Sequence, residues 1–214
     1  MRFNTSLLIL MCLALAGCRH PGVRGSGVER TEARQLGEFS EVEISGKFDI
    51  VIRCGQSPGA TVVTDDNLIP LIKTEVRGSV LHIYPEKDVS PRTDLHIDVS
   101  TPSLSRVMVS GVVDLDIRKV QGERLSLGIN GAATVVAEGE VRDAHFVISG
   151  AGRLASESLR CTDMHLVLSG AGKADVYASG DLDVTVSGAG SVHYTGSPRH
   201  ISKHISGIGF VSEK

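Results

Sequence analysis

Apolar and polar residues alternate along most of the chain, and glycines break this alternation every eight to ten residues. A period of two is typical of β-strands, whose successive side chains point to opposite faces. The clearest repeat is an apolar residue followed by Ser-Gly or Asn-Gly, at steps of 18 to 20 residues. Its polar position is occupied by Ser110, Asn130, Ser149, Ser169, Ser187 and Ser206, which are followed by Gly111, Gly131, Gly150, Gly170, Gly188 and Gly207.

The copies align into columns of similar residues. Three residues before the Ser or Asn stand Val107, Leu127, Phe146, Leu166, Val184 and Lys203, and one residue before it stand Val109, Ile129, Ile148, Leu168, Val186 and Ile205. Positions two apart share a face of a strand, so we expect both columns to point into a core. Similar residues come into register when each copy stacks on the one before it and covers its apolar face.

The sequence therefore predicts an all-β fold, a single-stranded parallel β-helix with coils of about 19 residues. Its domain spans residues 38–214. Residues 38–105 repeat less regularly, and we expect irregular, wider coils there that start the stack.

The glycine and serine columns invite separate explanations. Glycine permits the positive φ that a tight corner can demand. A Ser between glycines can be the nucleophile of a hydrolase, but a nucleophile is one residue, whereas this Ser recurs in five of the six copies. We therefore interpret the column as hydroxyls that bond along the stack, with Asn130 as a variant.

The N-terminus has the pattern of a bacterial lipoprotein leader. Arg2 precedes an apolar run over residues 7–16, which is too short to span a bilayer. The run ends in Leu-Ala-Gly-Cys, which resembles the lipobox, where a peptidase cuts before the cysteine and acyl chains such as palmitate are attached. We predict a signal peptide over residues 1–17 and lipidation of Cys18; an ordinary secretory leader is the alternative.

The leader also predicts where the protein resides. Residues 18–37 are polar and rich in Gly and Arg, as in a flexible tether. Arg19 is not the Asp that retains some bacterial lipoproteins in the inner membrane, so we expect a lipid-anchored protein of the cell envelope, in the outer membrane.

Composition argues against several functions. The net charge is −3, aromatic residues are 4% and Trp is absent, so the sequence favours neither nucleic-acid binding nor aromatic stacking on sugars. Cys54 and Cys161 could form a disulfide in an oxidising compartment. They lie far apart in the sequence, and we favour two small buried apolar residues.

One column carries candidate metal ligands. Four residues before the Ser or Asn stand Arg106, Ser126, His145, His165, Asp183 and Ser202, with the parity of an outward face. Zinc or copper could bind to His145, His165 and Asp183. We favour the interpretation that these residues form a solvated polar ladder. We expect no metal and no cofactor. A calcium roll is disfavoured because Arg153, Lys173 and Ser191 stand where it would need Asp.

The repeat resembles the family described as "Putative auto-transporter adhesin, head GIN domain". The resemblance covers about residues 38–211 and rests on the start of the domain (residues 39–52), Asp66-Asn67-Leu68, the Ser-Gly-Ala-Gly copies and residues 193–198. The two corners at residues 112–113 and 132–133 lack the expected Ala-Gly. The resemblance implies a right-handed parallel β-helix in exported, often lipid-anchored bacterial proteins without established catalytic residues.

These observations favour a non-catalytic binding or adhesion module of the envelope, with an unknown envelope protein or glycan as its partner. The alternative is an envelope carbohydrate-active enzyme, for which Asp114, Asp116, Asp175 and Arg118 are scattered candidates. The last copy ends without a cover, and Lys203 breaks its inward column. We therefore expect a loosened last coil, and a monomer or small closed oligomer rather than a fibre.

Overall fold

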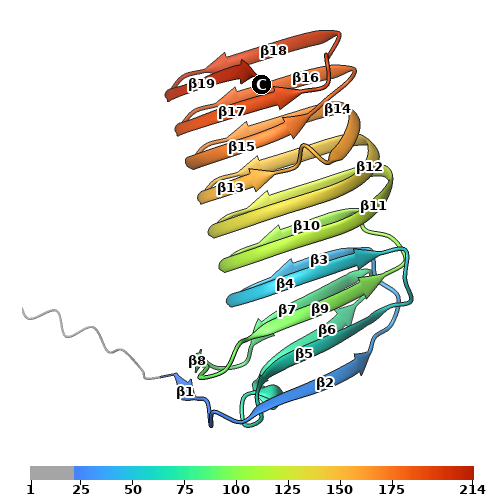
Figure 1. Cartoon of the computed structure of the whole chain (residues 1–214), viewed down its shortest axis with the longest axis vertical. Helices are drawn as coiled ribbons and strands as arrows, with labels where there is room; N and C mark the ends of the chain where they lie inside the picture. Colours follow the sequence, from blue (N-terminus) through green and yellow to red (C-terminus); the bar gives the residue numbers. More distant parts are fainter. Residues whose placement is uncertain (1–21) are drawn as a thin grey trace, which may run out of the picture.

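The chain forms a stack of parallel β-coils, as a computed structural model that describes residues 22–214 shows (Figure 1). Each coil has one strand before the Ser-Gly or Asn-Gly corner and one after it, so two parallel sheets face each other across the core. The coils contain β3 (Glu41–Ile44), β4 (Lys47–Cys54), β10 (Arg106–Val109), β11 (Val112–Ile129), β12 (Ala132–Ile148), β13 (Ala151–Ala155), β14 (Leu159–Leu168), β15 (Ala171–Tyr177), β16 (Asp181–Val186), β17 (Ala189–Thr195), β18 (His200–Ile205) and β19 (Ile208–Glu213). The predicted parallel β-helix is confirmed.

The predicted columns are confirmed residue by residue. The inward column pairs in the order Val107, Leu127, Phe146, Leu166, Val184 and Lys203. Its members are buried up to Val184, and they belong to one continuous apolar core. The last coil is formed and paired along β18 and β19, rather than interrupted at Lys203.

The two cysteines of the body are free and buried, as we favoured from the sequence. Burial raises the pKa of the Cys54 thiol to about 11 and that of Cys161 to about 12. The Cys161 thiol donates a hydrogen bond to the carbonyl oxygen of Tyr177 at 2.8 Å. Both thiols are therefore packing groups rather than nucleophiles.

The first coil does not lie at the end of the stack. β3 pairs with β10 on one side and with β7 (Val80–Pro85) on the other, and β4 lies likewise between β11 and β9 (His96–Thr101). The chain therefore leaves the first coil, builds the end of the stack and returns to start β10 (Figure 1).

Antiparallel strands close this N-terminal end. β5 (Gly59–Asp65) pairs antiparallel with β9, β2 (Glu29–Gln35) covers β5, and β6 (Ile72–Arg77) covers β7. A 3-10 turn η1 (Ile69–Leu71) joins β5 to β6, and β1 (Val23–Arg24) pairs with β8 (Val89–Ser90). The expected irregular, wider coils are thus wrong in part: this region is an antiparallel cap around parallel strands.

The predicted tether is also too long. Residues 22–37 include β1 and β2, which pair with the body, so a tether cannot extend to residue 37. Asp65 helps hold this segment. Its buried carboxylate accepts hydrogen bonds from the backbone N–H groups of Gly27, Arg92 and Thr93. Burial alone would raise the pKa of Asp65, but these bonds outweigh it and lower the pKa to about 2.

The predicted signal peptide, Cys18 and the start of the tether lie outside the described residues. Within residues 22–214, no helix has the length and apolar character needed to cross a membrane.

Close backbone contact, rather than positive φ, explains the glycine column. None of the six predicted glycines has positive φ; of the corner glycines only Gly46, in the first coil, does, at 128°. A Cβ on Gly170 would instead overlap the carbonyl oxygen of Gly150 in the previous coil, and each of the other five has the same relation to a glycine of its neighbour. The repeat thus brings backbone against backbone at the corner, where no side chain fits.

The ladder at the serine column is also a backbone ladder. The N–H of Ser169 donates to the carbonyl oxygen of Ile148 at 2.8 Å, and the other members bond in the same way. Among the described residues, the hydroxyls of this column make no hydrogen bond to protein, so the predicted hydroxyl ladder is absent there.

We predict that Gly170→Val destabilises the protein by about 3 kcal/mol, because the side chain forces two coils apart. Thermal or urea unfolding measures the loss. The matched control is Gly122→Ala in the bend of β11, since nothing lies within 4 Å of a Cβ at that glycine. Equal stability of the Gly170 and Gly122 variants would contradict the close-contact explanation.

Candidate functional site: a histidine and aspartate face

The outward side of the sheet before the corner carries a ladder of histidines and acids. Strand alternation turns His145 of β12, His165 of β14 and Asp183 of β16 away from the core, and the parallel register places them side by side in successive coils. Arg106 and Ser126 precede them and Ser202 follows. The predicted column is therefore confirmed as a ladder.

The two imidazoles stack on each other. Their centroids are 4.8 Å apart and the rings are 7° from parallel, at the spacing of two neighbouring strands. His165 continues the ladder through Nδ1, which lies 3.1 Å from Oδ2 of Asp183. The stacked histidines therefore expose their ring edges on this face, and His165 also contacts a carboxylate there.

A second ladder of acids runs beside the first. Asp143 pairs in register with Arg124 on one side and with Asp163 on the other. Oδ1 of Asp163 accepts the backbone N–H of Asp181 at 2.9 Å, and Oδ1 of Asp181 lies 2.9 Å from Nδ1 of His200. Two polar ladders, two residues apart along each strand, therefore cross the same coils.

The ladders enclose a shallow hollow of about 490 Å³. Its lining is Arg124, Ser126, Asp143, Ala144, His145, Asp163, Met164, His165, Asp181 and Asp183. Four of these residues are carboxylates and one is a guanidinium, so the hollow is negatively charged when the imidazoles are neutral.

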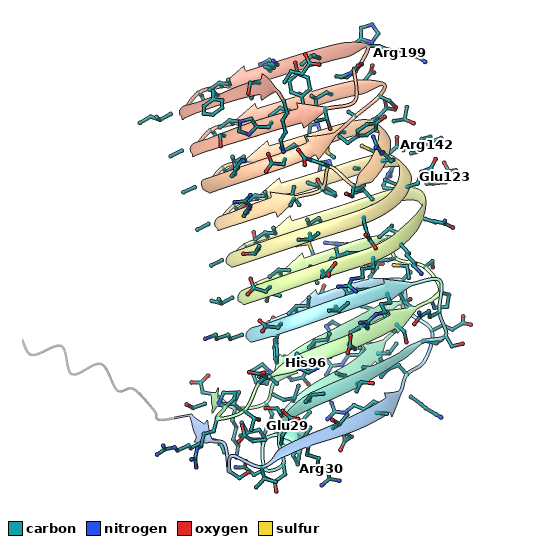
Figure 2. The ribbon with its side chains drawn as sticks, viewed as in Figure 1. Glu29, Arg30, His96, Glu123, Arg142 and Arg199 are labelled. Atoms are coloured by element: carbon teal, nitrogen blue, oxygen red, sulfur yellow. The ribbon has the colours of Figure 1, made fainter. Side chains whose placement is uncertain are left out.

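Hydrogen bonding and neighbouring charges shift the pKa of one group in the hollow, and burial with neighbouring charges shifts that of another. A hydrogen bond from Arg142 (2.9 Å) lowers the pKa of the Asp143 carboxyl, with Arg124 adding to the effect. Arg142 lies at the bend, where it also reaches Glu123 at 3.3 Å (Figure 2). Burial, and then the charges of His165 and Arg124, lower the pKa of His145.

The three candidate metal ligands are not arranged as a metal site. His145, His165 and Asp183 lie together, but the rings are stacked and Asp183 already contacts His165, so their donor atoms do not converge on one point. Across residues 22–214, no group of three or more His, Cys, Asp or Glu side chains is arranged to hold a metal ion.

The other candidates from the sequence lie elsewhere. Asp114, Asp116 and Asp175 stand on the sheet after the corner, on the opposite side of the core. There Asp116 pairs with Arg118 and Asp175 with Lys173. The structure therefore does not bring these acids together with the histidine ladder.

Sequence analysis missed the second ladder. Asp143, Asp163 and Asp181 stand two residues before His145, His165 and Asp183, so they share the outward parity that identified the first column. The copies were compared only up to four residues before the corner, whereas these acids stand six residues before it.

Comparison with known proteins agrees with this architecture. The model of the family described as "Putative auto-transporter adhesin, head GIN domain" matches residues 38–198. The chain belongs to this family. No curated protein matches the sequence.

Solved structures share the fold. A putative adhesin from Bacteroides fragilis NCTC 9343 is 21% identical with a TM-score of 0.72, over 90% of this chain and all of that one. A putative adhesin from Parabacteroides merdae ATCC 43184 is 17% identical with a TM-score of 0.55, over 90% of this chain and 98% of that one. Family membership thus supports an adhesion or binding module at the cell surface or envelope.

We predict that His145 titrates below its ordinary value of 6.5 and that His165→Gln raises its pKa part of the way back. The larger cause, burial, stays in the variant, whereas the neighbouring imidazolium is removed. NMR titration of the histidine ring signals measures both values. His204→Gln, on the last coil, is the control that leaves His145 unchanged. A midpoint at or above 6.5 would contradict the prediction.

Proposed function

We propose that this protein is a non-catalytic binding module of the bacterial cell envelope and that the histidine and aspartate face contacts its partner. The observation that carries the proposal is the pair of polar ladders beside a hollow of about 490 Å³. A repeated row of carboxylates and imidazoles matches a ligand that presents donors at regular spacing, such as an extended polypeptide or a glycan.

The charge of the hollow selects among such ligands. Four carboxylates against one guanidinium favour cations and hydrogen-bond donors and disfavour polyanions. Asp143 is engaged with Arg142 and Arg124, whereas the carboxylate of Asp163 accepts a backbone bond and makes no ion pair within residues 22–214. Asp163 is therefore the acid best placed to meet a cationic or hydroxyl group of a partner.

The same geometry favours binding over hydrolysis. A glycosidase needs a protonated carboxyl near a second carboxylate, whereas hydrogen bonding lowers the pKa of Asp143 and keeps it ionised. The hydroxyls of the recurring serines make no hydrogen bond to a base within the described part of the chain. A nucleophile needs such a base.

Binding to immobilised polymers tests the proposal. We expect retention on poly-lysine or on a neutral polysaccharide such as dextran, and none on poly-glutamate. Asp163→Asn with Asp181→Asn should weaken retention about tenfold, because two charge-assisted contacts are lost. Surface plasmon resonance at fixed salt measures the ratio.

The matched control is Asp114→Asn, which removes one exposed acid from the opposite sheet. It should leave retention unchanged. If the two face substitutions have no larger effect than the control, the histidine and aspartate face is not the binding surface.

We further propose that the module is lipid-anchored through Cys18 to the outer membrane. The support is the leader sequence: a short apolar run ends in Leu-Ala-Gly-Cys. Several acyl chains at one end would hold the body at the membrane, since each buried CH₂ adds about 0.8 kcal/mol.

Cys18→Ser should abolish acylation and move the protein from the membrane to the soluble fraction, because no acyl chain then enters the bilayer. Fractionation with labelled palmitate measures both effects. Cys54→Ser is the control and should leave acylation unchanged. A Cys18 variant that stays membrane-bound with its label would refute the anchor.

A further inference from the structure

The two ends of the stack are finished differently. Antiparallel strands cover the N-terminal end. Within residues 22–214, β18 pairs only with β16 and β19 only with β17, so the outer edges of these two strands present a row of N–H and C=O groups without strand partners (Figure 1). Such an edge is a template for pairing with another strand.

Apolar side chains gather at this open end. Ile201 and Ile205 of β18 are 42% and 44% exposed, and Ile208 and Phe210 of β19 are 88% and 54% exposed. They are half of the large apolar residues that are exposed in the described chain. A surface with free backbone groups and apolar side chains is suited to strand pairing rather than to permanent exposure.

Two inward columns change from apolar to charged in this last coil. Lys203 follows Val184 in the column of β18, and Glu213 follows Tyr194 in the column of β19. The Lys203 amine donates to the carbonyl oxygen of Val211 at 3.3 Å and lies 4.9 Å above the Tyr194 ring. Glu213 makes no ion pair within residues 22–214. The open end thus carries one inward cation and one inward anion, on opposite strands.

We infer that a second copy of this chain docks on the last coil, about a two-fold axis that lays β18 of each copy along β19 of the other. The chain reverses at the Ser206–Gly207 corner, so this operation makes the new strand pairs antiparallel. Facing residues must lie on the same side of the sheet. Joining residues 201–205 to residues 209–213 of the partner subunit meets this condition.

Charge complementarity selects this axis. In that register Lys203 lies diagonal to Glu213 of the partner subunit, within reach of long side chains, and the contact occurs twice. The other two-fold axis lays β18 on β18 and brings Lys203 opposite or diagonal to Lys203 of the partner subunit, which is repulsive. Opposite charges therefore favour the crossed pairing of β18 with β19.

Growth beyond two copies is blocked at the other end. β2 and β6 are the outer strands of the N-terminal cap, and both carry charged side chains. These are Glu29, Arg30, Glu32 and Arg34 on β2, of which Figure 2 labels the first two, and Lys73, Glu75 and Arg77 on β6. Charged side chains on an edge strand oppose pairing with further strands. The assembly is therefore a closed dimer of two rods that meet at their last coils, with their N-termini at opposite ends.

The role of this dimer rests on the proposed function, an anchored binding module of the envelope. Anchors at both far ends would place the two copies on facing membranes, so that the dimer joins one envelope to another. The dimer contact does not use the histidine and aspartate face, so the two proposals can fail separately.

Sedimentation equilibrium tests the contact with residues 19–214, which lack the proposed lipidation site Cys18, so that lipid does not drive association. Wild type should dimerise. Lys203→Glu and Glu213→Lys should each weaken self-association about tenfold or more, because like charges then meet twice. An equimolar mixture of the two variants should dimerise again, since each pair in the mixed dimer is oppositely charged.

Arg199→Glu is the matched control, because Arg199 lies at the bend of the last coil outside both strands (Figure 2). It should dimerise like wild type, as should the Asp163→Asn, Asp181→Asn variant. A wild-type chain that stays monomeric to about 1 mM overturns the inference. So does a mixture that fails to associate, or a single charge reversal without effect.

Discussion

The backbone pairing of each coil with the next is the interaction on which the rest of this structure depends. Parallel pairing fixes the register along the whole stack, so a residue that points inward in one coil is followed by an inward residue in the next. A single coil cannot bury its own apolar face, and its neighbours supply the cover. Glycine at the corner lets this pairing continue where the backbones approach too closely for a Cβ.

The regular part of the fold could be predicted because parallel pairing requires the same pattern of inward and outward residues in every coil. Inward positions must be apolar, so the recurring apolar residues, such as Val107, Leu127 and Phe146, predict the stack from the sequence. The glycines predicted a corner but not the reason why it needs glycine, because positive φ and close backbone contact both favour this residue. The φ angles of the corner glycines and the position of the Gly150 carbonyl oxygen distinguish the two explanations.

The N-terminal end was harder to predict because it departs from the repeat. Strand alternation predicts strands in this part of the chain, but it does not state whether a pair is parallel or antiparallel. Nor does it show that β3 lies between strands that come later in the chain. That order depends on contacts between distant segments, such as the bonds of Asp65 to Gly27 and Thr93.

The outward faces follow from the same pairing, with a different consequence. The core requires apolar residues, whereas solvent permits many residue types. Folding alone therefore does not require an outward column to keep one residue type through several coils. The aspartates at 143, 163 and 181 form such a column, although packing like charges at the strand spacing is unfavourable. Arg124, Arg142 and His200 offset part of that repulsion. Asp163 makes no ion pair within residues 22–214, and it lines the hollow. A cationic or hydrogen-bonding partner in the hollow would therefore relieve the repulsion that the arginines and His200 leave.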